Sequence, residues 1–108
     1  MAPAGSSSEL YDKLMDINTE AFEQGHFEVA YHTLAAAFHC GLLLQQTVLE
    51  ELEQRALEQR NWIDTYASTH PLSPQSAQAK GHVDVYTSLL LQIQTRKLMQ
   101  KTPHPGIP

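Results

Sequence analysis

Residues 25–41 have the sequence GHFEVAYHTLAAAFHCG, and this stretch determines the fold. Its apolar residues recur at steps of three and four, at positions 27, 30, 31, 34, 37 and 38. This spacing places them on one face of a helix, whereas a half-buried strand would alternate. Glycine adopts a positive φ at little cost and commonly follows the last residue of a helix. We therefore expect a helix between Gly25 and Gly41, with a turn at either end.

The segment before this helix has the same periodicity. Its expected core-facing residues are Leu10, Leu14, Ile17 and Ala21, widened by Tyr11, Met15 and Phe22. Residues 8–24 are therefore expected to form a first helix. The turn at Gly25 is short, which favours an antiparallel hairpin.

A longer pair of helices is expected over residues 43–68 and 74–101. Between them, a proline-rich break ends at Ser73–Pro74, a typical helix start. The residues expected on the core-facing stripes are Leu44, Val48, Leu52, Ala56, Ile63 and Tyr66 in one helix, and Ala79, Val83, Tyr86, Leu89, Leu90 and Ile93 in the other. Gly81 is a weak point in the second of these helices, because glycine costs about 1 kcal/mol relative to alanine in a helix interior.

These patterns predict one all-α domain over residues 8–101, made of four helices. A short antiparallel hairpin is expected to pack on a longer antiparallel hairpin, as in a helical bundle. The two long helices, of about 26 residues each, exceed their partners, so part of their apolar surface is expected to lack cover within one chain. Residues 1–7 and 102–108 are small, polar or proline-rich, and flexible tails are expected there.

Residues 9–41 resemble a tetratricopeptide repeat, a two-helix unit of about 34 residues. The matching residues are Gly25, Phe27, Ala30, Leu34 and Ala37. The resemblance implies a hairpin whose small residues let the two helices pack closely, and a unit that needs neighbours to bury its face. Asn18 departs from the family pattern, which has a large apolar residue in this part of the first helix.

The net charge of −5 is concentrated in the first hairpin. Residues 1–41 carry six acidic residues and one lysine, whereas residues 42–108 carry six acidic and six basic residues. An acidic surface repels phosphate backbones, so nucleic acid is not an expected partner. A basic protein partner is one interpretation of the acidity, and an ordinary solvated helix face is the other.

The single cysteine, Cys40, cannot form an internal disulfide, and neither a secretory signal nor a membrane-spanning run is visible. A cytoplasmic protein is expected. His32 and His39 share a helix face with Glu28, but the two histidines are about 10 Å apart along the axis, too far to share one ion. No metal or other cofactor is therefore expected. No catalytic motif is present, so no enzyme is expected either.

The strongest polar anomaly lies in the core-facing stripes. Arg55 and Gln59 interrupt the stripe of the third helix close to Trp62, and His82 interrupts that of the fourth beside Tyr86. Polar groups on a core face require partners or a ligand. They either line a pocket for an anionic or peptide group, or are satisfied within the fold, with Arg55 paired to a carboxylate and His82 at the edge.

The sequence thus predicts a non-enzymatic helical module for protein–protein interaction or scaffolding that self-associates. The alternative is a small-ligand-binding or regulatory helical bundle with a pocket near Arg55, Trp62 and Tyr86.

Overall fold

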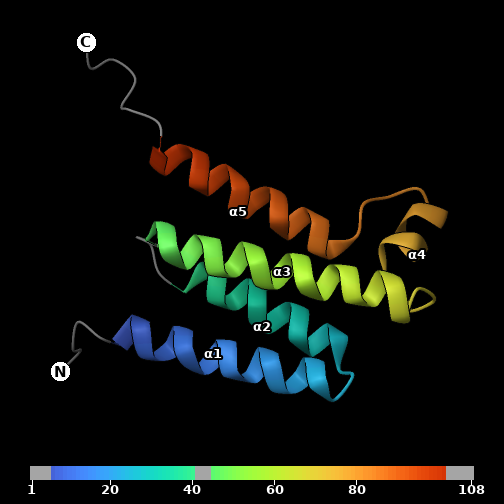
Figure 1. Cartoon of the computed structure of the whole chain (residues 1–108), viewed down its shortest axis with the longest axis horizontal. Helices are drawn as coiled ribbons and strands as arrows, with labels where there is room; N and C mark the ends of the chain where they lie inside the picture. Colours follow the sequence, from blue (N-terminus) through green and yellow to red (C-terminus); the bar gives the residue numbers. More distant parts are fainter. Residues whose placement is uncertain (1–5, 41–44, 102–108) are drawn as a thin grey trace, which may run out of the picture.

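The computed structural model describes residues 6–40 and 45–101, and Figure 1 shows their arrangement. The helices are α1 (Ser6–Glu23), α2 (Phe27–His39), α3 (Gln46–Tyr66), α4 (Pro74–Ala79) and α5 (Val85–Lys101). The described residues contain no strand, so the predicted all-α class is confirmed. None of these helices is long and apolar enough to cross a bilayer.

Most of the expected tails, and the helix junction at residues 41–44, lie outside the described ranges. Ser6 and Ser7 were expected in the N-terminal tail but belong to α1, which therefore begins two residues earlier than expected.

The turn between α1 and α2 is built as predicted. Gly25 has a φ of +80°, in the left-handed region. Its N–H donates to the carbonyl oxygen of Phe22 at 3.0 Å, and the N–H of His26 donates to that of Ala21 at 2.8 Å. These two bonds form a Schellman motif, which satisfies carbonyl groups that the helix end would otherwise leave unpaired.

The prediction of a single helix over residues 74–101 is wrong, because this segment forms two helices. Gly81 has a φ of +82°, and the N–H of His82 donates to the carbonyl oxygen of Ala77 at 3.0 Å, so α4 ends in a second Schellman motif. A new helix then begins after Asp84, whose Oδ2 accepts from the N–H of Thr87 at 2.9 Å. Residues 6–40 and 45–101 therefore contain five helices instead of the four expected.

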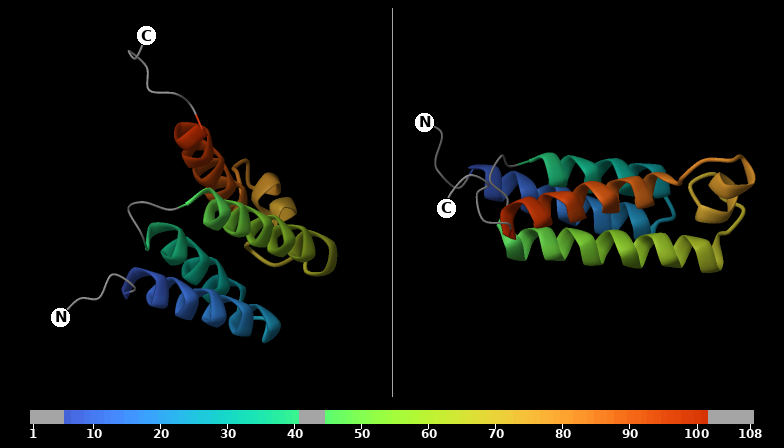
Figure 2. Two further views of the ribbon diagram at one scale, coloured as in Figure 1. Left: turned by 60° about the vertical axis from the view of Figure 1, so that its left-hand side comes forward. Right: turned by 90° about the horizontal axis from the view of Figure 1, so that it is seen from above.

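The helices form two antiparallel pairs that lie side by side. Figures 1 and 2 show α1 packed on α2 and α3 packed on α5, with α4 near the C-terminal end of α3. The molecule is flat, with extents of 48 × 39 × 17 Å. Its largest fully buried apolar side chains are Leu34, Leu49, Leu52, Ile63, Tyr86, Leu89 and Ile93, which come from α2, α3 and α5.

Several residues of the expected stripes face solvent. Leu10 and Ile17 are 51% and 48% exposed, because α1 turns Tyr11, Met15 and Asn18 inward instead. Other exposed members are Tyr66, Ala79 and Val83. The helix lengths are also closer than predicted, since α3 and α5 have 21 and 17 residues against 18 and 13 for α1 and α2. Unequal length is therefore a weaker argument for uncovered surface than the sequence suggested.

Candidate functional site

Two buried amide side chains form the centre of the candidate site. Asn18 of α1 is fully buried, and Gln59 of α3 is nearly so. Asn18 Nδ2 donates to Gln59 Oε1 at 3.1 Å, and Gln59 Nε2 donates back to Asn18 Oδ1 at 2.7 Å. Asn18 Nδ2 also donates to the carbonyl oxygen of Ala30 on α2 at 2.6 Å. The amide pair therefore ties three helices together and keeps its polar groups partnered, as burial requires.

Arg55, one turn before Gln59, is half-buried beside this pair. Its Nη1 donates to Asn18 Oδ1 at 3.0 Å, to the hydroxyl of Thr19 at 2.8 Å and to the carbonyl oxygen of Met15 at 3.3 Å. All three acceptors are neutral groups of α1. Arg55 belongs to neither of the two ion pairs among the described residues, so the expected pairing with a carboxylate is wrong there.

Tyr86 extends the network to α5. Its hydroxyl donates to Gln59 Oε1 at 2.9 Å, and its ring lies 5.6 Å from that of Tyr31. Burial, with a smaller contribution from Tyr31, raises the pKa of Tyr86 well above its usual range, because the phenolate is poorly solvated there. The hydroxyl thus stays protonated and remains a donor to Gln59.

Trp62 lies on α3, one turn after Gln59, in a cluster of aromatic rings. Its ring centroid is 5.6 Å from that of Phe22, 5.8 Å from that of Phe27 and 5.0 Å from that of Tyr66. Trp62 remains 43% exposed and Tyr66 71% exposed. The cluster therefore joins α1, α2 and α3 on its inner side and offers aromatic surface to solvent on its outer side.

A hollow of about 360 Å³ lies between α1 and α3, and we call it the α1/α3 hollow. Its lining includes Phe22 and Glu23 from α1, and Arg55, Glu58, Gln59 and Trp62 from α3. The backbones of these helices hardly approach each other, so side chains bridge the space between them. The aromatic wall of the hollow is formed by Phe22 and Trp62, and the guanidinium group of Arg55 lies beside it. The exposed carboxylates of Glu23 and Glu58 form its rim.

The structure thus collects three of the five predicted site residues, Arg55, Gln59 and Trp62, around one hollow. Tyr86 contacts Gln59 from behind, in the core. His82 does not join them, because the break at Gly81 places it, exposed, in the connection between α4 and α5. The expectation that His82 shares a helix stripe with Tyr86 is therefore wrong.

Two groups of this region were not singled out as site residues from the sequence. Asn18 takes part in most hydrogen bonds of the network. The one indication of this in the sequence is that a polar residue occupies an otherwise apolar position of α1. Tyr11 bridges α1 and α3 by donating its hydroxyl to Glu51 Oε1. Burial, together with the neighbouring Glu51 carboxylate, raises the pKa of Tyr11 well above its usual range.

A second hollow of about 360 Å³ lies between α5 and the end of α2. Its lining includes Phe38, Leu91, Thr95, Arg96 and Met99. Leu91 and Met99 are 57% and 68% exposed, and the Arg96 guanidinium carbon lies 5.7 Å from the Phe38 ring centroid. The outer side of α5 therefore presents exposed apolar side chains at Leu91 and Met99, with the polar Gln92 and Thr95 and the Arg96 cation between them.

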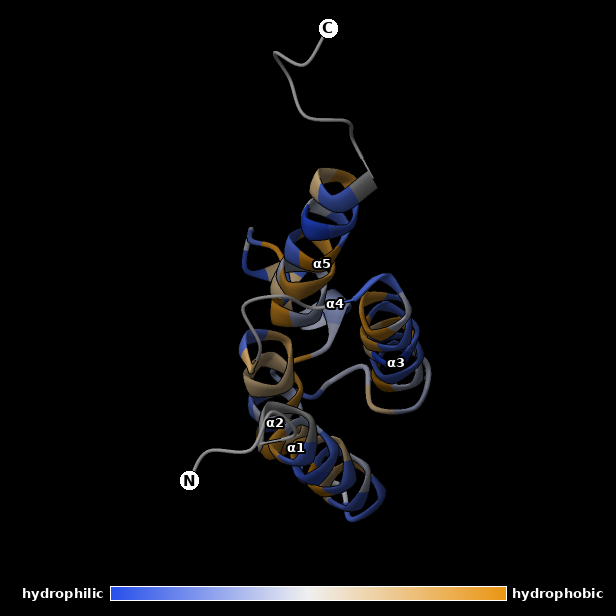
Figure 3. Ribbon diagram, turned by 90° about the vertical axis from the view of Figure 1, so that its left-hand side faces the viewer, coloured by the Kyte–Doolittle hydropathy of each residue, from blue (hydrophilic) through white to orange (hydrophobic). Residues whose placement is uncertain are grey.

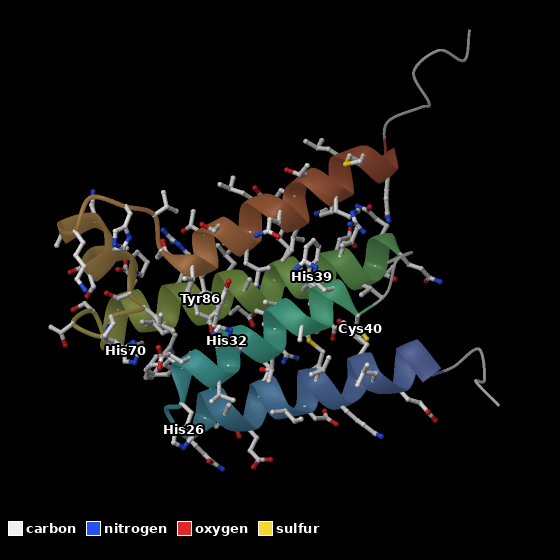
Figure 4. The ribbon with its side chains drawn as sticks, turned by 180° about the vertical axis from the view of Figure 1, so that it is seen from behind. His26, His32, His39, Cys40, His70 and Tyr86 are labelled. Atoms are coloured by element: carbon white, nitrogen blue, oxygen red, sulfur yellow. The ribbon has the colours of Figure 1, made fainter. Side chains whose placement is uncertain are left out.

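The two histidines of α2 do not share a site: His39 lines the second hollow, whose lining, among the described residues, includes no acidic residue, and His32 lines neither hollow. Figure 4 shows His32 and His39 at separate positions along α2, with Cys40 at its end. Residues 6–40 and 45–101 hold no group of three or more histidine, cysteine, aspartate or glutamate side chains that could bind a metal ion together.

Comparisons of the chain with protein-family models, with curated proteins and with solved structures give no match, so the proposals below rest on sequence and geometry.

Proposed function

We propose that the chain is a non-enzymatic helical module for protein–protein interaction that associates with further copies of itself. The observation that carries this proposal is the outer face of α5, where Leu91 and Met99 are both more than half exposed. Large apolar side chains exposed on one face of a helix favour partner binding. The hollow against Phe38 gives this face a concave part into which a side chain of a partner fits.

Two features of the sequence support the remainder of the proposal. The chain has no nucleophile–base, phosphate-loop or dinucleotide-binding motif, which favours binding over catalysis. The resemblance of residues 9–41 to a tetratricopeptide repeat favours a unit that stacks on neighbours. A cytoplasmic location is part of the same proposal and rests on the single cysteine.

Sedimentation of the purified chain over a range of micromolar concentrations tests self-association. The wild-type protein is expected to sediment as a species heavier than one chain. Leu91→Glu should shift the distribution toward the monomer without loss of helicity, because Leu91 is on the surface. Val29→Glu is the matched control, since Val29 is 49% exposed on another helix. A wild-type protein that remains monomeric throughout would refute the proposal.

The α1/α3 hollow supports a second candidate, a regulatory bundle that binds a small ligand. Its volume is within the range of small-molecule sites, and it combines an aromatic wall with the Arg55 guanidinium. Native mass spectrometry of the protein purified from cells tests this candidate. A retained small molecule that is lost in Trp62→Ala but kept in Tyr66→Ala would support it.

A further inference from the structure

We propose that the α1/α3 hollow receives the outer face of α5 from a second copy, so that the chain assembles head to tail. This inference rests on the proposed self-association and identifies the surface that α5 contacts. The two surfaces involved are unlike, which distinguishes this arrangement from a symmetric dimer formed by two α5 helices.

The charges of the helices are the first argument. Helix α1 carries five carboxylates and one lysine, a net charge of −4. Helix α3 carries five carboxylates and two arginines, a net charge of −3. Helix α5 has no acidic residue and three basic ones, Arg96, Lys97 and Lys101, for a charge of +3. Lys97 is paired with Glu53 of α3 within the same chain at 2.6 Å, so these two charges cancel. Without them, the helices that border the hollow carry −6 and α5 carries +2, so the hollow attracts α5, whereas two α5 helices repel each other.

The apolar surfaces are the second argument. The outer face of α5 presents aliphatic side chains, including Leu91 and Met99, which are more than half exposed. The hollow presents the exposed sides of Phe22 and Trp62, and Tyr66 extends this aromatic surface beyond it. Tryptophan, tyrosine and arginine are the residues that most often dominate binding energy at interfaces. Trp62, Tyr66 and Arg55 supply all three types at or beside the hollow. An aliphatic ridge of α5 therefore meets an aromatic wall.

The positions of the two surfaces are the third argument. The end-on view of Figure 3 places α5 and α1 at opposite ends of the molecule, with α3 to one side. Because the surfaces lie on different parts of one copy, each molecule donates α5 to one neighbour and accepts α5 from another. Such contacts grow with concentration unless they close into a ring.

Charge reversal at the rim of the hollow tests the inference on the full chain. Glu23 and Glu58 are exposed rim residues, so Glu23→Lys/Glu58→Lys should leave the fold intact while raising the charge of the hollow by four units. We expect association to weaken about tenfold or more. Asp16→Lys/Glu50→Lys is the control, because it makes the same charge change at exposed positions of the same two helices that do not line the hollow.

A mixing experiment then identifies the geometry. Leu91→Glu keeps an intact hollow, and Glu23→Lys/Glu58→Lys keeps an intact α5 face, so neither variant assembles alone under this proposal. A mixture of the two should form a 1:1 heterodimer that does not grow further, seen by sedimentation. Wild-type association should also weaken when salt is raised from about 0.1 M to about 1 M, which shortens the Debye length from about 10 Å to about 3 Å.

Four results would overturn the head-to-tail arrangement. They are normal assembly of Glu23→Lys/Glu58→Lys, equal loss in the charge control, no heterodimer in the mixture, and stronger association at high salt. If the wild type still self-associates in these cases, the proposed function stands and only its geometry is refuted. A monomeric wild type refutes both.

Discussion

The side-chain amides of Asn18 and Gln59 hold each other through two reciprocal hydrogen bonds, 41 residues apart in the chain. Because both are buried, the loss of one leaves the other without its partner. Asn18→Leu should lower the free energy of unfolding by about 2–3 kcal/mol, since Gln59 and the Ala30 carbonyl lose their bonds and Arg55 loses an acceptor. Urea denaturation measures this change.

The matched control for that substitution is Asn61→Leu on the exposed side of α3. It makes the same chemical change where water replaces any lost bond, so an effect within about 0.5 kcal/mol is expected. Similar losses for Asn18→Leu and Asn61→Leu would show that the buried amide pair contributes nothing special to stability.

Stability at high pH should depend on Tyr86. Its pKa is raised in the folded state, so the stability it contributes is complete below the unfolded pKa of about 10 and falls as the pH rises above that value. Between the unfolded and the folded pKa, this one group should lower the free energy of unfolding by about 1.4 kcal/mol per pH unit. Denaturant titrations at several alkaline pH values should give a shallower slope for Tyr86→Phe than for wild type. Equal slopes would contradict the assignment.

Gly81 should respond to substitution according to backbone conformation alone. A Cβ atom at this position would meet nothing within 4 Å, but the φ of +82° strains most L-residues. Gly81→Ala should therefore cost about 1 kcal/mol, measured as a lower thermal midpoint. Gly81→Asn should cost less, because asparagine tolerates the left-handed region. A neutral alanine variant would mean that α4 and α5 are not separated by this turn in solution.

Removing metal should not affect folding. The two histidines of α2 lie two turns apart, and structural metal binding would appear as folding free energy. Thermal unfolding with and without a strong chelator should give the same midpoint. A lower midpoint that zinc restores would establish a metal site.

The two glycine turns show what local sequence does and does not reveal. The turn at Gly25 is visible in the sequence because one apolar pattern ends before it and a new one begins after it. The turn at Gly81 is hidden, because Ala79, Val83 and Tyr86 continue a helical spacing across the break. The missed signal was the combination of Gly81 with Asp84 and Thr87, in which the aspartate caps a new helix three residues after the glycine.

The rotation of α1 was not readable from periodicity alone. Leu10 and Ile17 fit an apolar seam as well as Tyr11 and Met15 do, and the hydrophobic effect alone does not choose between these faces. The buried face includes Asn18, whose partner Gln59 belongs to α3 and lies 41 residues away in the sequence. Long-range hydrogen bonds of this kind are set by tertiary contacts, beyond the reach of a local pattern.

The part of the candidate site that lies on one helix is predictable from the sequence. Arg55, Gln59 and Trp62 are three or four positions apart on α3, so helical spacing brings them to one side. Their partners come from α1, α2 and α5, and local spacing does not show which of those side chains meet α3. His82 was misplaced for the same reason as the helix break, because its expected neighbour Tyr86 lies in a different helix.

The amide network also limits how the sequence of this chain is able to diverge. A change at Asn18, Gln59 or Tyr86 alone strands a buried polar group, whereas joint replacement by apolar residues of similar shape removes the need for partners. We expect these positions, distant along the chain, to covary in any homologous sequence, with substitutions accepted as a set. An Asn18→Leu/Gln59→Leu/Tyr86→Phe variant should accordingly be more stable than Asn18→Leu alone, a case of compensation among mutations that are each harmful.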